Sequence, residues 1–255
     1  MASLENRDAI KYEIRERFDR FVRGQFPDLS EFNSNHDGAE GDWLTYKMGL
    51  QPNGKNEPDY LGFEMKKHSV GKTTFGDWSP DVSLYKKPLK ILGRDEFLRL
   101  FGTPNPAKHN RYSWSGAVFP KVGGANFAGQ QLSIEPTGDI VARYSHKEDK
   151  RPERDKVKQR LDECNELELA RWRKDSLQVK LESKFGVLGW FRCIKDKHGT
   201  YQEIQFGMPL KYPHFSELFR TGSIFIDCGM YEGNPRPYMM WRASNQVWDS
   251  LSEGQ

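Results

Sequence analysis

The chain has 255 residues, enough for one sizeable hydrophobic core or for a core with a smaller second lobe. Aromatic residues make up 13% of the chain, which argues against an intrinsically disordered protein, because disordered chains are poor in aromatic side chains. The formal net charge of +3 permits a nucleic-acid partner without requiring one.

The sequence shows no feature of a secreted or membrane protein. The N-terminus is charged from residue 5 onward, and no stretch approaches the about 18 apolar residues of a membrane-spanning helix. The three cysteines, Cys164, Cys193 and Cys228, lack the spacing of a zinc site, which favours free thiols in a reducing compartment. We expect a cytoplasmic location and no membrane partner.

The first quarter of the chain predicts two helices and a strand. Apolar side chains recur at helical spacing over residues 5–23, so this segment predicts an amphipathic helix. Residues 25–40 predict a loop, residues 41–48 a short helix, and residues 51–59 a turn that holds two prolines. Residues 60–68 alternate between apolar and charged side chains, a pattern typical of a strand.

The middle of the chain continues with a loop-rich stretch up to about residue 90. A short helix is predicted over residues 94–101, and turn residues separate three predicted strands at 114–119, 130–135 and 139–145. The charged residues 146–160 predict a solvated loop, which leads into a helix over residues 155–173.

The last third of the chain predicts strands over residues 176–182, 186–194 and 201–206 and a helix over residues 214–220. It ends in a hairpin with arms at residues 223–231 and 237–244. The alternation of helices and strands favours a mixed α/β architecture.

One string of residues indicates chemistry. Pro58-Asp59 precedes the predicted strand, and Glu64 and Lys66 lie two residues apart within it, so both project from the same face. Asp59 lies at the turn, where its carboxylate can come alongside that of Glu64. Two carboxylates and the carbonyl of Met65 form a site suited to Mg²⁺.

Lys66 would lie beside the metal-bound water, where it could either help lower the pKa of that water or hold the attacking hydroxide against the phosphate. The string alone leaves a second interpretation open, in which these are ordinary solvated charges on the outer face of a strand.

Three stretches resemble the MvaI/BcnI family of type II restriction endonucleases and its relative MutH, all of the PD-(D/E)XK superfamily. They are residues 41–49, residues 58–68, and the hairpin around residues 227–231 and 241–242. Weaker similarity extends the resemblance over most of residues 35–245.

The resemblance implies an α/β fold with a mixed central sheet flanked by helices and a smaller DNA-recognition lobe forming a cleft. We expect one restriction-endonuclease domain over residues 1–255. Its catalytic lobe would span roughly 1–150 with parts of 155–210, and its recognition lobe roughly 211–250.

The resemblance also implies a function: Mg²⁺-dependent cleavage of double-stranded DNA at a short CC-N-GG-like site, by a monomer, in a host with a cognate DNA methyltransferase. One position departs from the family. Where the family helix carries a glutamate, this sequence has Thr45, for which Glu40 or Asp42 could compensate.

Two groups of residues are candidates for DNA binding. Lys67, His68 and Lys72 follow the catalytic residues along the chain. The hairpin resembles a ribbon that reads the major groove, where arginine prefers guanine and aspartate prefers cytosine. Its candidates are Asp227, Tyr231, Asn234, Arg236, Tyr238 and Arg242.

Two alternatives stay open at this point: a MutH-like nicking or repair endonuclease that uses the same residues, and a DNA-binding protein without catalysis. A small-molecule enzyme is disfavoured, because the sequence has no GxGxxG, GxxxxGK[ST], GxSxG or HExxH motif.

Overall fold

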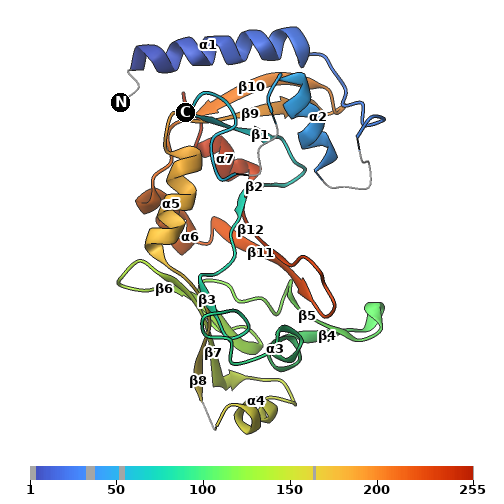
Figure 1. Cartoon of the computed structure of the whole chain (residues 1–255), viewed down its shortest axis with the longest axis vertical. Helices are drawn as coiled ribbons and strands as arrows, with labels where there is room; N and C mark the ends of the chain where they lie inside the picture. Colours follow the sequence, from blue (N-terminus) through green and yellow to red (C-terminus); the bar gives the residue numbers. More distant parts are fainter. Residues whose placement is uncertain (1–3, 33–37, 52–54, 163–164, 255) are drawn as a thin grey trace. The chain divides into compact units, whose positions relative to one another are not determined.

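The computed structural model describes residues 4–32, 38–51, 55–162 and 165–254. Its helices are α1 (Leu4–Phe21), α2 (Ala39–Lys47), α3 (Arg94–Phe101), the 3-10 turn η1 (Pro106–Lys108), α4 (Asp155–Arg160), α5 (Lys174–Phe185), α6 (Tyr212–Arg220) and α7 (Asn245–Ser250). Its strands are β1 (Phe63–Lys67), β2 (Lys72–Asp77), β3 (Val82–Ser83), β4 (Thr103–Asn105), β5 (Arg111–Ser115), β6 (Ala128–Ile134), β7 (Ile140–Asp149), β8 (Glu166–Trp172), β9 (Gly189–Lys195), β10 (Tyr201–Gly207), β11 (Ile224–Tyr231) and β12 (Tyr238–Ser244). The mixed α/β class expected from the sequence is confirmed (Figure 1).

The chain divides into two compact units. The first comprises residues 1–73, 179–212 and 244–255, and the second comprises residues 74–178 and 213–243. This division differs from the lobes expected from the sequence, because residues 74–150 belong with the hairpin rather than with the N-terminal segment. The functional roles expected of the two lobes stay predictions.

The first unit is built on a three-stranded sheet in the order β1-β9-β10. β1 runs parallel to β9, with Glu64 opposite Trp190 and Lys66 opposite Arg192, whereas β10 is antiparallel to β9. This is the mixed sheet that the sequence predicts, and β1 forms one of its edges.

Helices cover both faces of this sheet. Helices α1 and α2 pack on one face (Figure 1), where the ring of Trp43 stacks on that of Tyr201 with centroids 5.7 Å apart. On the other face, the Trp248 ring of α7 packs edge-on against that of Trp190 at 5.0 Å and lies 6.2 Å from that of Phe185 in α5. Each face of β1 is therefore covered.

The two ends of the described chain meet within the first unit. Arg7 of α1 donates hydrogen bonds to the carbonyls of Leu188 at 2.8 Å and Gly207 at 3.1 Å, and its guanidinium pairs with Glu253. Asp249 of α7 pairs with the buried Arg192 of β9. These contacts attach both terminal helices to the ends and the face of the same sheet.

The second unit contains two antiparallel sheets, ordered β2-β12-β11-β5-β4 and β3-β8-β7-β6. Tryptophans fill the space between its elements. The indole nitrogens of Trp172 and Trp241 both donate to the carbonyl of Trp78, at 2.8 and 3.0 Å. Their polar atoms are thereby satisfied inside an apolar core.

The sequence suggested that the C-terminal hairpin is a free two-stranded ribbon, but in the structure it is part of a larger sheet. β11 pairs with β12 on one side and with β5 on the other, and β12 is flanked in turn by β2. Both hairpin strands are therefore inner strands of a five-stranded sheet, with one face buried and one face open.

Most predicted elements are confirmed with shifted ends, including the first three helices, the strands that became β1, β6, β7, β9 and β10, and the hairpin. The expected strand over residues 60–68 is shorter, because residues 60–62 form a turn in which Leu61 and Gly62 have φ values of 44° and 95°. The expected loop over residues 25–40 lies partly outside the described residues. The stretch up to residue 90, expected to be a loop, contains β2 and β3.

Two adjacent predictions are wrong: part of the predicted helix is a strand, and the predicted strand that follows it is part of a helix. The helix expected over residues 155–173 ends at Arg160, and residues 166–172 form β8, because pairing with β7 and β3 outweighs the helical propensity of Glu, Leu and Ala. The strand expected over residues 176–182 is part of helix α5. Its buried residues Leu177, Leu181 and Phe185 recur every four positions.

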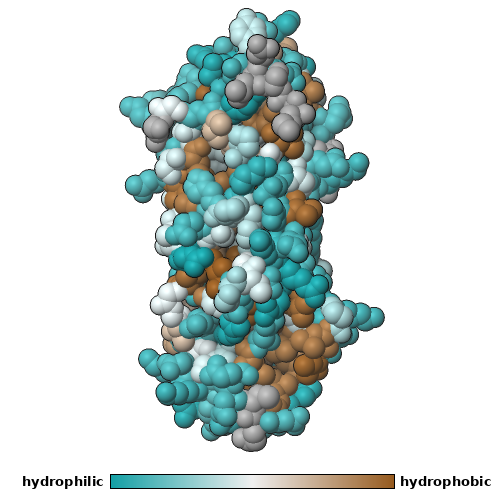
Figure 2. All heavy atoms as spheres, turned by 90° about the vertical axis from the view of Figure 1, so that its left-hand side faces the viewer, coloured by the Kyte–Doolittle hydropathy of each residue, from teal (hydrophilic) through white to brown (hydrophobic). Residues whose placement is uncertain are grey.

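The surface is mostly polar, as Figure 2 shows for one face, where apolar side chains appear in separate patches among hydrophilic ones. Over the described part of the chain, no helix is both long and apolar enough to span a bilayer. Cys193 and Cys228 are buried free thiols, as expected, and Cys164 lies outside the described residues.

The close packing of β10 on β9 gives a test of the fold. A Cβ atom on Gly207 would lie 2.0 Å from the Trp190 ring, so Gly207→Ala should destabilise the protein by about 1–3 kcal/mol. Gly41→Ala is the matched control, since no atom lies within 4 Å of its Cβ position. Urea denaturation should show a lower midpoint for Gly207→Ala alone, and equal midpoints would contradict this packing.

Candidate active site

Strand β1 places two of the predicted residues side by side. Glu64 and Lys66 project from the same face, and the Nζ atom of Lys66 lies 2.7 Å from Oε1 of Glu64. Their neighbours Phe63 and Met65 point the opposite way, into the core under α1 and α2. The alternation of apolar and charged residues in the sequence therefore places the charged side chains on one face of β1 and the apolar ones on the other, as expected.

These charges are not solvated. Glu64 is 1% exposed, and the Lys66 side chain is 14% exposed. The Lys66 ammonium also lies over the Phe185 ring, 5.3 Å from its centroid. The interpretation as ordinary charges on an outer strand face is therefore wrong, because α5 and α7 cover that face.

The turn before β1 brings Asp59 to the edge of this strand. Oδ2 of Asp59 accepts a hydrogen bond from the N–H of Met65 at 2.9 Å. The turn is closed by reciprocal backbone hydrogen bonds between Tyr60 and Phe63. Because the N–H and C=O of one residue point to the same side of a strand, the Met65 carbonyl faces the same edge as Asp59.

The electrostatics of Glu64 are unusual for a glutamate. Burial raises the pKa of Glu64 to about 7, with a further rise from the charge of Asp59, while Lys66 and Lys184 oppose the shift. Its Oε2 atom is buried and has no hydrogen-bond partner among the described residues. An unsatisfied carboxylate oxygen is costly to bury, which indicates a site for a ligand.

Lys184 is the residue of this site that the sequence analysis missed. Its Nζ atom lies 3.0 Å from Oε1 of Glu64, the oxygen that Lys66 also contacts. It was missed because residues 176–182 were expected to form a strand. The spacing of Leu177, Leu181 and Phe185 is the signal that predicts a helix reaching Lys184.

The helix α2 does not supply a third carboxylate to this cluster. The hydroxyl of Thr45 donates to the carbonyl of Gly41 at 2.8 Å, within its own helix. Glu40 accepts from the Tyr201 hydroxyl at 2.6 Å and pairs with Lys195 at 2.7 Å. Burial alone would raise the pKa of Glu40, but Lys195 and Tyr201 together hold it below its usual value.

In the part of the chain that the structure describes, no three His, Cys, Asp or Glu side chains converge as a metal cluster. The site therefore offers two carboxylates and a backbone carbonyl.

The residues after Lys66 have separate environments. Lys67 points to the α2 side, where its Nζ atom lies 3.8 Å from Glu40. His68 lies 3.1 Å from the side-chain nitrogen of Asn245, and burial lowers its pKa, with Arg192 adding to the effect. The lowered pKa favours the uncharged form of His68, and its contact with DNA stays a prediction. Lys72 is exposed at the start of β2.

The structure places only some of the hairpin residues expected to read DNA on one face of the sheet. Asp227, Tyr231, Tyr238 and Arg242 lie on the open face, and Arg242 pairs with Asp227 at 3.3 Å. Asn234 is buried and does not belong with them.

Both polar ends of the Asn234 side chain are used inside the turn. Its nitrogen donates to the carbonyl of Gly229 at 3.0 Å, and its oxygen accepts from the N–H of Arg236 at 2.9 Å. Arg236 itself is exposed in that turn.

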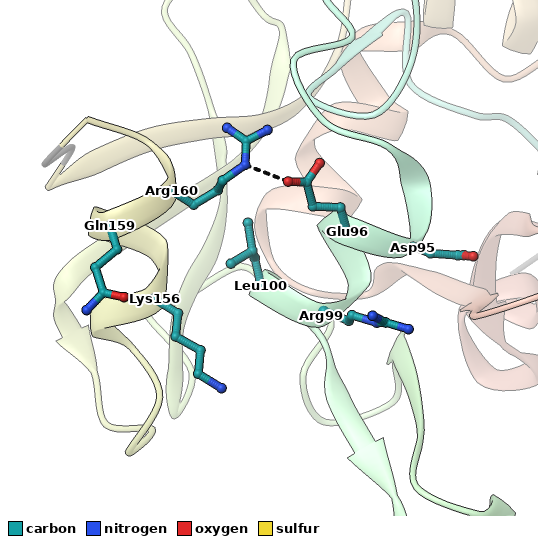
Figure 3. A pocket seen from close by; sticks show the side chains of 7 residues that line it. All are labelled: Asp95, Glu96, Arg99, Leu100, Lys156, Gln159 and Arg160. Carbon is teal, nitrogen blue, oxygen red and sulfur yellow. Dashed lines mark hydrogen bonds and ion pairs between the residues drawn. The ribbon is translucent and has the colours of Figure 1, made fainter.

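The second unit also carries a groove of about 540 Å³ between α3 and α4 (Figure 3). Its walls mix acids and bases, and Nε of Arg160 lies 2.5 Å from Glu96 across it. Arg99 pairs with Glu232 at 2.6 Å. This groove lacks an unpaired carboxylate oxygen like that of Glu64, so it is a weaker candidate for catalysis.

The raised pKa of Glu64 predicts a pH-dependent stability difference. The folded protein keeps this proton up to about pH 7, whereas the unfolded chain releases it near pH 4.5, so the contribution of Glu64 to stability falls between these values. Glu64→Gln cannot ionise, and its stability relative to the unaltered protein should rise over the same interval. Urea denaturation at pH 5, 6, 7 and 8 measures this difference.

Glu203→Gln, at an exposed position of β10, controls for the loss of one negative charge. A difference between Glu64→Gln and the unaltered protein that stays constant from pH 5 to pH 8 would contradict the burial of the ionised group.

Known proteins match nearly the whole chain. The family model described as LlaMI restriction endonuclease matches residues 22–254. The type II restriction enzyme ScrFI of Lactococcus lactis subsp. cremoris is 40% identical over 261 residues, covering 94% of this chain and 96% of that enzyme.

A solved complex of restriction endonuclease MvaI with its cognate DNA substrate has the same fold, with a TM-score of 0.62 at 13% identity and 98% coverage of both chains. The resemblance stated from the sequence is thereby confirmed. The chain belongs to the LlaMI restriction endonuclease family and is a type II site-specific deoxyribonuclease.

Proposed function

We propose that the chain hydrolyses double-stranded DNA with Mg²⁺ bound between Asp59, Glu64 and the carbonyl of Met65. The observation that carries this proposal is the buried Oε2 atom of Glu64. It has no hydrogen-bond partner within the described ranges, and the carboxylate of Asp59 is close enough to raise the pKa of Glu64. Mg²⁺ prefers oxygen ligands and is commonly bound through one or two carboxylates, so this donor set fits the ion.

Each residue of the site has a distinct task in this proposal. Lys66 and Lys184 both hold Oε1 of Glu64, which leaves Oε2 directed to the ion. When bound, Mg²⁺ would neutralise the charge that develops on the scissile phosphate. The hydrogen bond between Asp59 and the N–H of Met65 fixes the second carboxylate at the edge of β1.

Lys66 is the group that acts on the reacting atoms. Its ammonium contacts Oε1 of Glu64, and its other N–H groups can donate hydrogen bonds to the attacking water and to a phosphate oxygen. The water oxygen would form a bond to phosphorus as it gives up a proton to solvent, while the bond to the leaving sugar oxygen breaks and that oxygen takes up a proton from solvent. Lys72, exposed near this unit's sheet, is a candidate for contact with the DNA backbone.

Recognition is proposed for the open face of the second unit's five-stranded sheet. Asp227, Tyr238 and Arg242 offer the acceptors and donors that distinguish base edges, and the exposed Arg236 can contact the backbone. The proposed target is a short CC-N-GG-like site. We further propose that the enzyme is a cytoplasmic monomer, acting in a host whose DNA is protected by a cognate methyltransferase.

The cutting reaction itself gives the first test. With Mg²⁺, the purified protein should convert unmethylated supercoiled plasmid to linear DNA, and sequenced fragment ends should share a CC-N-GG core. A chelator should stop cleavage, and added Mg²⁺ should restore it. Open-circle product alone would show nicking instead, and fragment ends without a common sequence would contradict the proposed target.

The role of Lys66 gives the second test. Lys66→Ala should cut about 10²- to 10³-fold more slowly, the usual loss when one hydrogen-bond donor to the transition state is removed. Gel-shift binding of DNA should persist, because the affinity comes from other contacts. Lys197→Ala, at an exposed turn of the same unit, removes the same charge and should cut normally. Cleavage by Lys66→Ala at the original rate would place the reaction elsewhere.

A further inference from the structure

The open face of the five-stranded sheet carries one arginine that the proposed function does not yet use. Strand register places Tyr231 opposite Ser113 and Gly229 opposite both Ser115 and Tyr238, so these side chains share a face. The opposite face is buried, with Trp114, Met230 and Trp241 in the core. Arg111 begins β5 at the end of this open face, two residues before Ser113.

The guanidinium of Arg111 is held flat on an aromatic ring. Its central carbon lies 3.5 Å from the centroid of the Tyr231 ring. Planar guanidinium groups stack well on aromatic faces, and stacking limits the directions in which their N–H groups point. The contact therefore fixes the plane of the Arg111 donors before any ligand arrives.

The Nε donor of Arg111 is buried and has no hydrogen-bond partner among the described residues. Arg242, the arginine expected to read a guanine, lies 3.3 Å from the carboxylate of Asp227. Of these two arginines, Arg111 is the one that is oriented by a ring.

The backbone around the stack is anchored. Glu232, the residue after Tyr231, accepts a hydrogen bond from the N–H of Tyr112 at 2.9 Å and pairs with Arg99 of α3 at 2.6 Å. The N–H of Glu232 in turn donates to the carbonyl of Tyr112 at 3.0 Å. The end of β11 is thus fixed to the start of β5, so the distance between the ring and the guanidinium is fixed by the sheet.

We infer that Arg111 reads a guanine of the target site, with Tyr231 as the positioning residue that holds its guanidinium in plane. A fixed fork of donors matches the paired O6 and N7 acceptors of guanine in the major groove. The same fork also matches two phosphate oxygens, but a phosphate contact carries no sequence information, so a lost base preference distinguishes the two contacts. This inference rests on the proposed function for the use of the open face, but it concerns base reading and not cutting.

The test measures binding alone. A random duplex library is selected with the Lys66→Ala protein, and the selection is repeated with Arg111→Ala added. We expect a defined target for the first protein and loss of preference at one guanine for the second, by about 10- to 100-fold, the discrimination of a bidentate arginine contact. Arg111→Lys should weaken the base preference at the same guanine, because lysine keeps the positive charge but lacks the paired donors of the guanidinium group.

Base analogues test the contact without relying on the fold of a variant. Replacing that guanine by 7-deazaguanine removes the N7 acceptor and should weaken binding by the Lys66→Ala protein. The same replacement should cost nothing once Arg111 is alanine. Tyr231→Phe keeps the ring and should keep the preference, whereas Tyr231→Ala should reduce it. Lys108→Ala, exposed just before β5, is the control for the loss of one nearby positive charge.

Three outcomes would overturn the inference: no enriched target, an Arg111→Ala protein that keeps every base preference, or binding that weakens equally for all sequences, as expected of a phosphate contact. Failure of the proposed function looks different. In that case the library gives a defined target, the guanine responds to Arg111, and the protein with Lys66 restored still cuts nothing.

Discussion

The buried carboxylate of Glu64 imposes the main physical constraint on the first unit. Two ammonium groups contact one of its oxygens, at 2.7 and 3.0 Å, while no residue in the described part of the chain hydrogen-bonds its other oxygen. A group of this kind is unfavourable for folding, because burial disfavours its charged form. The surrounding unit has to stabilise it with contacts made elsewhere.

That stabilisation comes from both faces of a short sheet. On one side α1 and α2 bury an aromatic and aliphatic core, and on the other side Trp190, Phe185 and Trp248 surround the charged residues with rings. The lysine partners of Glu64 come from two different elements, β1 and α5, so their spacing depends on how α5 packs on the sheet. The positions of the two lysine ammonium groups around Glu64 therefore depend on apolar packing.

The second unit meets a different requirement. Its sheet buries tryptophans on one face and leaves polar and aromatic side chains on the other, so the residues proposed to bind DNA need no burial. Order comes from stacking and from hydrogen bonds within turns, as for Arg111 on Tyr231 and for Asn234 in the hairpin. DNA contacts of this kind depend on fixed directions more than on low dielectric.

Local patterns in the sequence were sufficient to predict β1, the shared face of Glu64 and Lys66, and the turn that carries Asp59. Each follows from neighbours in the chain. Lys184 could not be placed, because its contact with Glu64 spans 120 positions and depends on a helix that was taken for a strand. β8 was missed because its residues favour a helix until β7 pairs with them, and the burial of Asn234 depends on a carbonyl five residues away.

The path of the chain through the first unit has a consequence for biosynthesis. Its sheet needs β1 from the N-terminal part, β9 and β10 from residues 179–212, and a cover from α7, and Glu253 then joins Arg7. Proteins emerge from the ribosome in order, at roughly 5–20 residues per second. The face that holds Glu64 therefore stays uncovered until α7 has been made, so translation products that stop before α7 lack the helix that covers the proposed catalytic residues.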